Sequence, residues 1–419
     1  MENVVITGMG VISSLGNSPE LMYENLDKGV CAFRSEPEWR KHVGLETFVS
    51  APAHPYDAMS LPRNVRRSMS PMSEMGYLAT VDALHDAQIC VGRNETANGS
   101  HLFRPDPMRV GLVMGSTSGS PIFLESYFKK LFEMGGPKGQ MSTSFFKVMN
   151  HSVATNVALA LGYSGPLLSP SSACSTSSQA AILAMQLIRA GVYDLAIVGG
   201  ADELHYTSVA VFDTVKASAK HYNDEPQKIP GPFSKNRDGL VVSEGAGVII
   251  LESERHAKAR KAKIYAQLCG GTYFCDGVHM SQPQSEQMAL TMQYALKDSQ
   301  VSAEAIDYVN AHATATAMGD EQEVKAISSI FTQKKVPVSS LKGHLGHSLA
   351  ACGVIEIIAI VEMMKNKNLI GNRNVTEVSP DFDQVDILTA NRKGAINYAL
   401  SNNFAFGGMN TSLVVKNLM

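Results

Sequence analysis

The chain has 419 residues, of which 44% are hydrophobic and 18% charged, and its formal net charge is −3. This balance is typical of a globular protein with a large core, and it gives no overall basic field to hold nucleic acid or an anionic membrane. No apolar run reaches the roughly 18 residues that span a bilayer, and the start MENVVITGMG lacks the positive segment of a signal peptide. We therefore expect a cytoplasmic α/β enzyme.

Strand-like runs in the first part of the chain lie at residues 4–10, 109–116, 194–203 and 245–252. Their near-continuous Val, Ile and Leu residues predict strands that are buried on both faces, as in sheets covered by helices. The segment 177–191 is apolar at almost every position, which predicts a buried helix. Polar, proline-bearing stretches, which we expect to form surface loops, lie at 34–62 and 92–108.

A charged helical segment, SERHAKARKAK at 253–263, marks a seam in the chain. Beyond it a second set of strand-like runs follows, at 263–271, 306–312, 336–340, 396–408 and 411–418. Two comparable sets of strands and helices predict two α/β halves. We place these halves at residues 1–254 and 255–419.

Cys174 lies in the run SSACSTSS, directly before the predicted buried helix. Unpaired backbone N–H groups at a helix N-terminus favour a thiolate and can bind an oxyanion, so this setting predicts a nucleophile with a lowered pKa. A small core cysteine is the alternative. The other cysteines, at 31, 90, 269, 275 and 352, have no paired CxxC spacing, so we expect neither a disulfide framework nor a metal site.

A cysteine that attacks acyl groups needs a proton shuttle, which histidine usually supplies. His312 in NAHATATAMGD and His347 in LKGHLGHSLAACG each follow a strand-like run and lie amid small residues. His344 lies three residues before His347, and spacing alone does not choose between the two. A solvated or structural histidine is the alternative at each position.

These stretches resemble the β-ketoacyl-acyl carrier protein synthases of the thiolase superfamily. The resemblance runs through VVITGMGVISSLG, SSACSTSS, PFSKNRDGLVVSEGAGVIILE, NAHATATAMGD and ALSNNFAFGGMN, and so covers nearly the whole chain. A further family motif has a lysine, then Gly-His, then a glycine. Lys342, Gly346, His347 and Gly353 satisfy this motif, which selects His347 over His344.

The resemblance implies a thiolase-like fold with two similar α/β halves packed as αβαβα layers. It implies an acyltransferase that joins an acyl thioester to malonyl-acyl carrier protein by decarboxylative Claisen condensation. No cofactor is expected, because decarboxylation itself supplies the carbanion. The implied partners are an acyl carrier protein and a second subunit, either identical or a related chain-length subunit.

The resemblance also assigns roles to individual residues. The implied catalytic residues are Cys174, His312 and His347, with Lys342 and Glu323 organising the histidines. The implied substrate-binding residues are Thr314 and Thr316 for the phosphopantetheine arm, Phe406 as gatekeeper and Ser118 at the bottom of the chain tunnel. Backbone N–H groups of Cys174 and Phe406 are the implied oxyanion hole, and carrier docking is assigned to Arg63, Arg67 and Lys138. Asn310, Glu356, Ser401 and Asn402 match a monovalent-cation site of some relatives, for which polar packing is an equal alternative.

Departures from the family pattern leave the subgroup open. They occur at Ala313, Ala315, Ala317, Ala350, Ala405 and Met409. Ala405 replaces a glycine and so loses backbone freedom beside Phe406. HATATxxGD is similar to aryl polyene enzymes, whereas KASAKHYNDEP and GHSL are similar to the fatty acid synthase I type.

Two other classes of protein fit the chain less well. A non-catalytic chain-length subunit typically lacks the nucleophile, which is present here as Cys174. A degradative thiolase needs a second catalytic cysteine near the C-terminus, and none follows Cys352.

Overall fold

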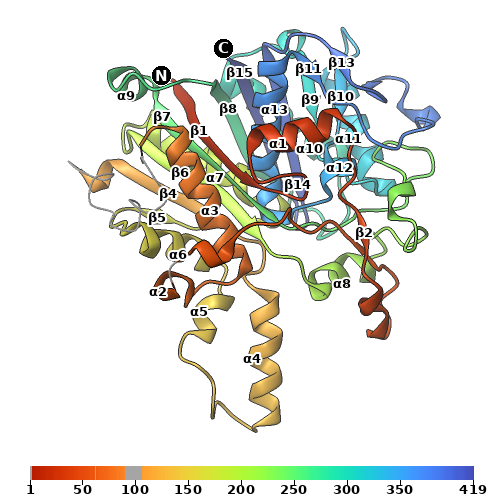
Figure 1. The fold of residues 1–419 in the computed structure, drawn as a ribbon. Helices are drawn as coiled ribbons and strands as arrows, with labels where there is room; N and C mark the ends of the chain where they lie inside the picture. Colours follow the sequence, from red (N-terminus) through yellow and green to blue (C-terminus); the bar gives the residue numbers. More distant parts are fainter. Residues whose placement is uncertain (1, 62, 90–105) are drawn as a thin grey trace.

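The computed structural model describes residues 2–61, 63–89 and 106–419 (Figure 1). Within these residues the main sheet has 11 strands in the order β12-β10-β9-β14-β15-β8-β1-β7-β6-β4-β5. In that order the strands are β12 (Asp386–Ile387), β10 (Pro337–Ser339), β9 (Tyr308–Asn310), β14 (Tyr398–Ala405), β15 (Met409–Asn417), β8 (Ala266–Cys275), β1 (Val4–Ile12), β7 (Gly245–Ser253), β6 (Leu195–Asp202), β4 (Val110–Gly115) and β5 (Leu167–Leu168). Two small sheets pair β2 (Arg34–Ser35) with β3 (Val49–Ser50) and β11 (Asn368–Leu369) with β13 (Arg392–Lys393).

Helices cover both outer faces of the main sheet, and further helices pack between its two halves. They are α1 (Pro19–Asp27), α2 (Arg63–Arg66), α3 (Pro71–Asp86), α4 (Pro121–Glu133), α5 (Ser144–Val148), α6 (Ser152–Leu161), α7 (Thr176–Arg189), α8 (Tyr206–Thr214), α9 (Glu254–Ala259), α10 (Ser285–Ser299), α11 (Ala317–Ile330), α12 (Lys342–Leu345) and α13 (Cys352–Asn366).

Three apolar cores divide the molecule into five layers. The central core joins α7 and α13 to inward-facing residues of both halves of the sheet. A second core packs α3 and α6 against β4, β6 and β7, and a third packs α10 and α11 against β9, β10 and β14. These layers confirm the αβαβα packing expected from the sequence.

The burial of the predicted elements follows their composition. Every residue of β1, β6 and β7 is buried, as their continuous apolar runs predict. Because α7 and α13 lie between two sheet surfaces, they are apolar nearly all round rather than along one stripe.

The two halves join in one continuous ladder. Residues 4–6 of β1 pair antiparallel with residues 266–268 of β8, and α9 forms the charged seam between the halves. The boundary between residues 254 and 255 stays a prediction. No described helix is long and apolar enough to cross a bilayer.

The stretch 34–62 differs from the surface loop expected for it. Its residues 34–35 and 49–50 form the β2–β3 pair, and the side chains of Trp39 and Val49 are buried. Apolar side chains that are spaced irregularly within a polar stretch show no periodicity, so this packing could not be predicted from the sequence. Most of the second predicted loop, from 92 to 105, lies outside the described residues, as does Cys90.

Candidate active site

Cys174 lies in a single 3-10 turn, Ala173–Ser175, immediately before α7. Ala173 adopts the left-handed backbone conformation, with φ +48°, which is rare for a residue with a Cβ and often marks a functional turn. The Cys352 thiol donates a hydrogen bond to the Cys174 carbonyl oxygen at 3.1 Å. The turn therefore presents the Cys174 side chain from a fixed backbone, with only 4% of the residue exposed.

His312 follows β9, and a buried carboxylate holds its backbone. The N–H groups of His312 and Ala313 donate to the two oxygens of Glu323 at 2.9 and 2.7 Å. Burial raises the pKa of Glu323 to about 7, although the two donors favour its anion. Glu323 thus positions His312 through the main chain.

His347 follows a turn that requires glycine. Gly346 has φ +76°, and a Cβ there would lie 2.9 Å from the Ser243 side chain. The N–H of His347 donates to the carbonyl oxygen of Val241 at 2.7 Å, which holds the turn against the segment that contains Val241. His344, in contrast, faces backbone carbonyl oxygens, with its Nε2 3.0 Å from that of Gly371. The structure therefore brings His347, and not His344, to the sulfur of Cys174.

The three predicted catalytic side chains converge on one point. Nε2 of His347 lies 2.9 Å from Sγ of Cys174, and the rings of His312 and His347 are 5.3 Å apart in an edge-to-face arrangement. Neither Nδ1 has a hydrogen-bond partner in the described part of the chain. Neither ring is therefore held in one tautomer, and each Nε2 is free to accept or to donate a proton.

Lys342 supplies a positive charge behind the histidines. Its Nζ lies 2.5 Å from Oε1 of Glu356, and both side chains are buried. Burial by itself lowers the pKa of Lys342, but Glu356 raises it above the usual value. Burial lowers the pKa of both His312 and His347 well below 6.5, and the Lys342 ammonium acts in the same direction. Both imidazoles are therefore neutral at pH 7.

The expectation of a lowered pKa for Cys174 is wrong. Burial raises the pKa of this thiol to about 12, although Lys342 and the backbone N–H groups of Cys174 and Phe406 favour the thiolate. Removal from water outweighs these contributions, because a bare thiolate loses its hydration. Cys174 therefore rests as a thiol, and His347 is placed to take its proton.

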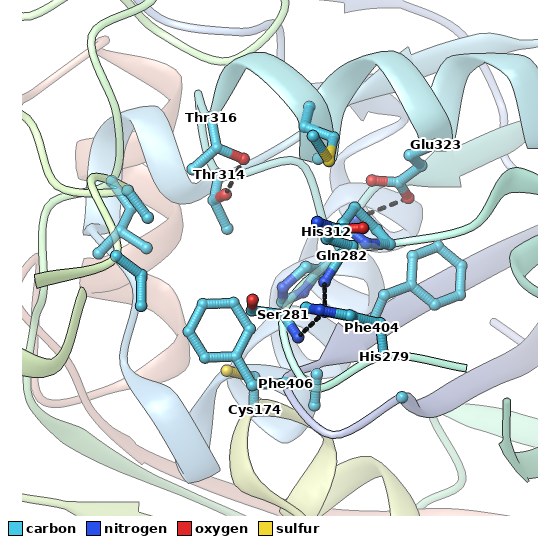
Figure 2. Close-up of a pocket in the computed structure, with 18 of the residues that line it drawn as sticks. Cys174, His279, Ser281, Gln282, His312, Thr314, Thr316, Glu323, Phe404 and Phe406 are labelled. Carbon is cyan, nitrogen blue, oxygen red and sulfur yellow. Dashed lines mark hydrogen bonds between the residues drawn. The ribbon is translucent and has the colours of Figure 1, made fainter. Parts of the chain in front are cut away.

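A cavity of about 420 Å³ opens beside Cys174. The residues that line it include His312, His347, Thr314 and Thr316. Figure 2 shows these threonines at the end of the cavity away from Cys174, with their hydroxyl oxygens 3.2 Å apart. The Phe406 ring lies 5.4 Å from that of Phe212, which also lines the cavity.

The loop that carries the threonines is held by another buried carboxylate. Asp320 accepts hydrogen bonds from the N–H groups of Thr314 and Ala315 at 3.0 and 3.1 Å. Ala315 has φ +65°, a left-handed conformation at one of the positions where the chain departs from the family pattern.

Four of the predicted site residues lie away from this cavity. Ser118 is exposed, three residues before α4, and does not line the cavity. Arg63, Arg67 and Lys138 are exposed side chains, the first two at α2 and the third in the turn after α4. Their roles stay predictions.

Cys174, His312 and His347 offer ligand atoms within 4.8 Å of one another, the one such group among the described residues. These atom types suit zinc. The Lys342 ammonium faces the same three groups and opposes a bound cation.

The residues matched to a monovalent-cation site mostly bond to protein groups. Asn310 Nδ2 donates to Ser401 at 3.3 Å, Ser412 donates to Asn402 at 2.7 Å, and Glu356 is paired with Lys342. Among the described residues, Asn310 Oδ1 is buried and has no hydrogen-bond partner.

Sequence reasoning missed several residues of the site. Asp202 ends β6, is buried, and accepts hydrogen bonds from the N–H groups of Thr117 and Ala350 at 3.1 and 2.8 Å. Phe212 and the loop 276–284 also line the cavity. In that loop Nδ1 of His279 accepts from two backbone N–H groups (Figure 2). The one sequence signal that could have predicted this loop as part of the site is a histidine in a turn directly after a strand.

Residues 1–257 match the family model described as Beta-ketoacyl synthase, N-terminal domain, and residues 265–376 match Beta-ketoacyl synthase, C-terminal domain. The chain belongs to the β-ketoacyl synthase family. A "3-oxoacyl-[acyl-carrier-protein] synthase 1" of Buchnera aphidicola is 33% identical to this β-ketoacyl synthase, over 99% of each chain.

Solved structures agree with this assignment. A β-ketoacyl synthase from Burkholderia phymatum has a TM-score of 0.93 with 39% identity, and a type II polyketide ketosynthase in complex with its acyl-carrier protein has 0.87 with 26% identity. Both comparisons cover 100% of each chain. The thiolase-like ketosynthase fold is thereby confirmed.

Proposed function

We propose that this β-ketoacyl synthase lengthens an acyl thioester by decarboxylative condensation with malonyl-acyl carrier protein. The observation that carries the proposal is the contact between Cys174 Sγ and His347 Nε2 at 2.9 Å, with His312 beside it. A thiol, two neutral histidines and a two-donor oxyanion site are the groups that acyl transfer followed by enolate formation requires.

In the first half-reaction Cys174 attacks the carbonyl carbon of the acyl thioester. His347 Nε2 accepts the thiol proton and passes it to the departing carrier thiolate, so that protons balance. The N–H groups of Cys174 and Phe406, which face the sulfur, stabilise the tetrahedral oxyanion. The acyl group remains on Cys174.

In the second half-reaction malonyl thioester loses carbon dioxide and leaves an enolate. His312 and His347 stabilise the enolate oxygen as neutral Nε2–H donors, His347 after its remaining proton moves from the unpartnered Nδ1 to Nε2. The buried Lys342 adds a positive charge behind them. The enolate carbon attacks the acyl-Cys174 carbonyl, and collapse of the tetrahedral species releases the thiolate. The thiolate then takes up from solvent the one proton that this half-reaction consumes. This sequence needs no redox cofactor.

The carrier protein is the proposed macromolecular partner. Arg63 and Arg67 at α2 and Lys138 after α4 are exposed cations that suit an acidic carrier, because complementary charge speeds encounter. One related ketosynthase structure contains an acyl-carrier protein, which supports this class of partner. Action in the cytoplasm stays a prediction.

We also propose a second subunit, either identical or related, against α4, α5 and β5. In Figure 1 α4 and α5 extend from one end of the molecule. Phe132 on α4 is 74% exposed and Phe145 on α5 is 54% exposed. Among the described strands, β5 pairs with β4 alone and forms the sheet edge. A free edge beside exposed aromatic residues favours pairing with another chain.

The test is a reconstituted condensation. The chain is incubated with an acyl-carrier protein and malonyl-carrier protein, and the products are measured by mass spectrometry. A β-ketoacyl product two carbons longer than the primer is expected, with release of carbon dioxide. Acyl transfer without any elongated product would contradict the proposal.

A further inference from the structure

The mouth of the catalytic cavity carries a lysine side chain. Among the described residues that line the cavity, Lys216 is the only lysine or arginine. Its side chain is 66% exposed, whereas Cys174 in the same lining is 4% exposed. The cavity therefore runs from a buried thiol to an exposed ammonium.

The end of α8 fixes the point from which Lys216 extends. Phe212 on this helix places its ring 6.2 Å from that of His347, so α8 touches the catalytic centre. Two backbone hydrogen bonds end the helix. Lys216 N–H donates to the carbonyl oxygen of Asp213 and Ala217 N–H donates to that of Phe212, both at 2.9 Å. Lys216 itself has φ +58°. Its backbone is thus held about one turn beyond Phe212.

The charge on Lys216 is available to a ligand. Its nearest carboxylate oxygen, Oε2 of Glu46, lies 3.5 Å from its Nζ, while the Nζ of Lys220 lies 2.5 Å from the same oxygen. The three groups carry a net positive charge, and Glu46 pairs more closely with Lys220. Asp276, a half-buried carboxylate of the lining, accepts a hydrogen bond from Val278 N–H in its own turn at 3.0 Å.

We propose that Lys216 binds the phosphate of the phosphopantetheine arm as this arm enters the cavity. The inference rests on the proposed function, in which acyl groups reach Cys174 on that arm. The arm's thiol end must lie at Cys174, so its phosphate end must lie outward, toward the mouth. A lysine ammonium binds phosphate as a compact point charge and needs no fixed geometry.

Two acyl donors that differ only in the phosphate test the inference. Acyl-pantetheine and acyl-4′-phosphopantetheine carry the same thioester and amides, and acylation of Cys174 is followed by intact mass. The wild-type chain should show a lower KM for the phosphorylated donor. Lys216→Ala should raise that KM roughly fivefold, as expected for one exposed ion pair, and leave the KM for acyl-pantetheine unchanged.

Matched variants separate this role from a general change in surface charge. Lys216→Arg should keep the low KM for the phosphorylated donor. Lys261→Ala, which removes an exposed cation that neither lines the cavity nor pairs with Glu46, should behave as wild type. Added salt should reduce the preference of the wild type for the phosphorylated donor.

An equal KM for the two donors in Lys216→Ala and in the wild type would overturn the inference while leaving the proposed function intact. An equal rise for both donors in Lys216→Ala would also overturn it. Failure of the wild type to accept either donor would instead overturn the proposed function, and this inference with it.

Discussion

His312 and His347 touch different partners in the cavity, and so their loss should have different effects. His347 contacts Cys174 directly, whereas His312 lies beyond it, with its backbone held by Glu323. We expect His312→Ala to keep acylation of Cys174 within a few fold and to lose decarboxylation. His347→Ala should slow acylation and decarboxylation together, because its Nε2 serves both.

Release of carbon dioxide from malonyl thioester and acyl-enzyme formation by intact mass measure the two steps separately. Complete loss of acylation in both variants would contradict this division. Glu323→Gln serves as a control for position, since its amide keeps one acceptor for the backbone N–H groups of residues 312 and 313.

Asp202 predicts a pH-dependent contribution to stability. Burial raises the pKa of this carboxyl from 3.8 to about 7. The folded state therefore binds its proton more tightly than the unfolded chain. The resulting stabilisation is present below about pH 4 and is lost as the pH rises through about 7.

Asp202→Asn removes this titration. The free energy of unfolding of the wild type minus that of the variant should fall by roughly 2–3 kcal/mol between about pH 5 and pH 8. Urea unfolding of both proteins across this range measures the difference. A difference that does not change with pH would show that Asp202 ionises normally.

The sequence indicates the reacting groups of this site better than the groups that hold them. Cys174 and His347 stand in motifs that their chemistry makes recognisable. Asp202 is a single carboxylate at a strand end, and only the fold shows that it joins two loops near Cys174. The raised pKa of Cys174 could not be predicted either, because the sequence indicates the start of the helix but not how deeply the thiol is buried.

At the scale of elements, α2 and the residue after it form the predicted carrier contact. Arg67 follows α2 directly, and its N–H donates to the Arg63 carbonyl oxygen at 3.1 Å, so both side chains extend from one turn. Arg67→Glu should raise KM for carrier-bound acyl groups roughly fivefold, because it opposes the steering charge. It should leave KM for a small acyl thioester unchanged.

Lys261→Glu is a matched control for this change, since Lys261 is exposed just after α9, which lies well apart from α2 (Figure 1). Equal KM values for the Arg67 variant and wild type would remove α2 from the carrier contact.

The predicted elements match the structure where a strand or helix is buried on all sides. The runs predicted at 4–10, 194–203 and 245–252 correspond to β1, β6 and β7 at 4–12, 195–202 and 245–253. The short pair β2–β3 was missed, because two residues per strand carry no period. The pairing of β1 with β8 joins residues more than 250 positions apart, which no local pattern reveals.

At the scale of the whole molecule, the exposed end formed by α4, α5 and β5 predicts a dimer. Phe132→Asp places a charge on a side chain that is 74% exposed in the single chain. We expect light scattering to give twice the 45.1 kDa chain mass for wild type and a shift toward the single-chain mass for this variant. Val43→Asp, at an apolar residue that is 105% exposed on another segment, is the control. A wild-type monomer at all concentrations would contradict the predicted interface.

The proposed condensation depends on one covalent intermediate, an acyl group on Cys174. The chain is mixed with an acyl-carrier protein, quenched, digested and mapped by mass spectrometry before and after malonyl-carrier protein is added. We predict one acyl group on the peptide that contains Cys174, its disappearance on addition of malonyl-carrier protein, and a β-ketoacyl product two carbons longer. A stable acyl adduct on Cys174→Ala, or an acyl group on another residue that chases into product, would contradict the account.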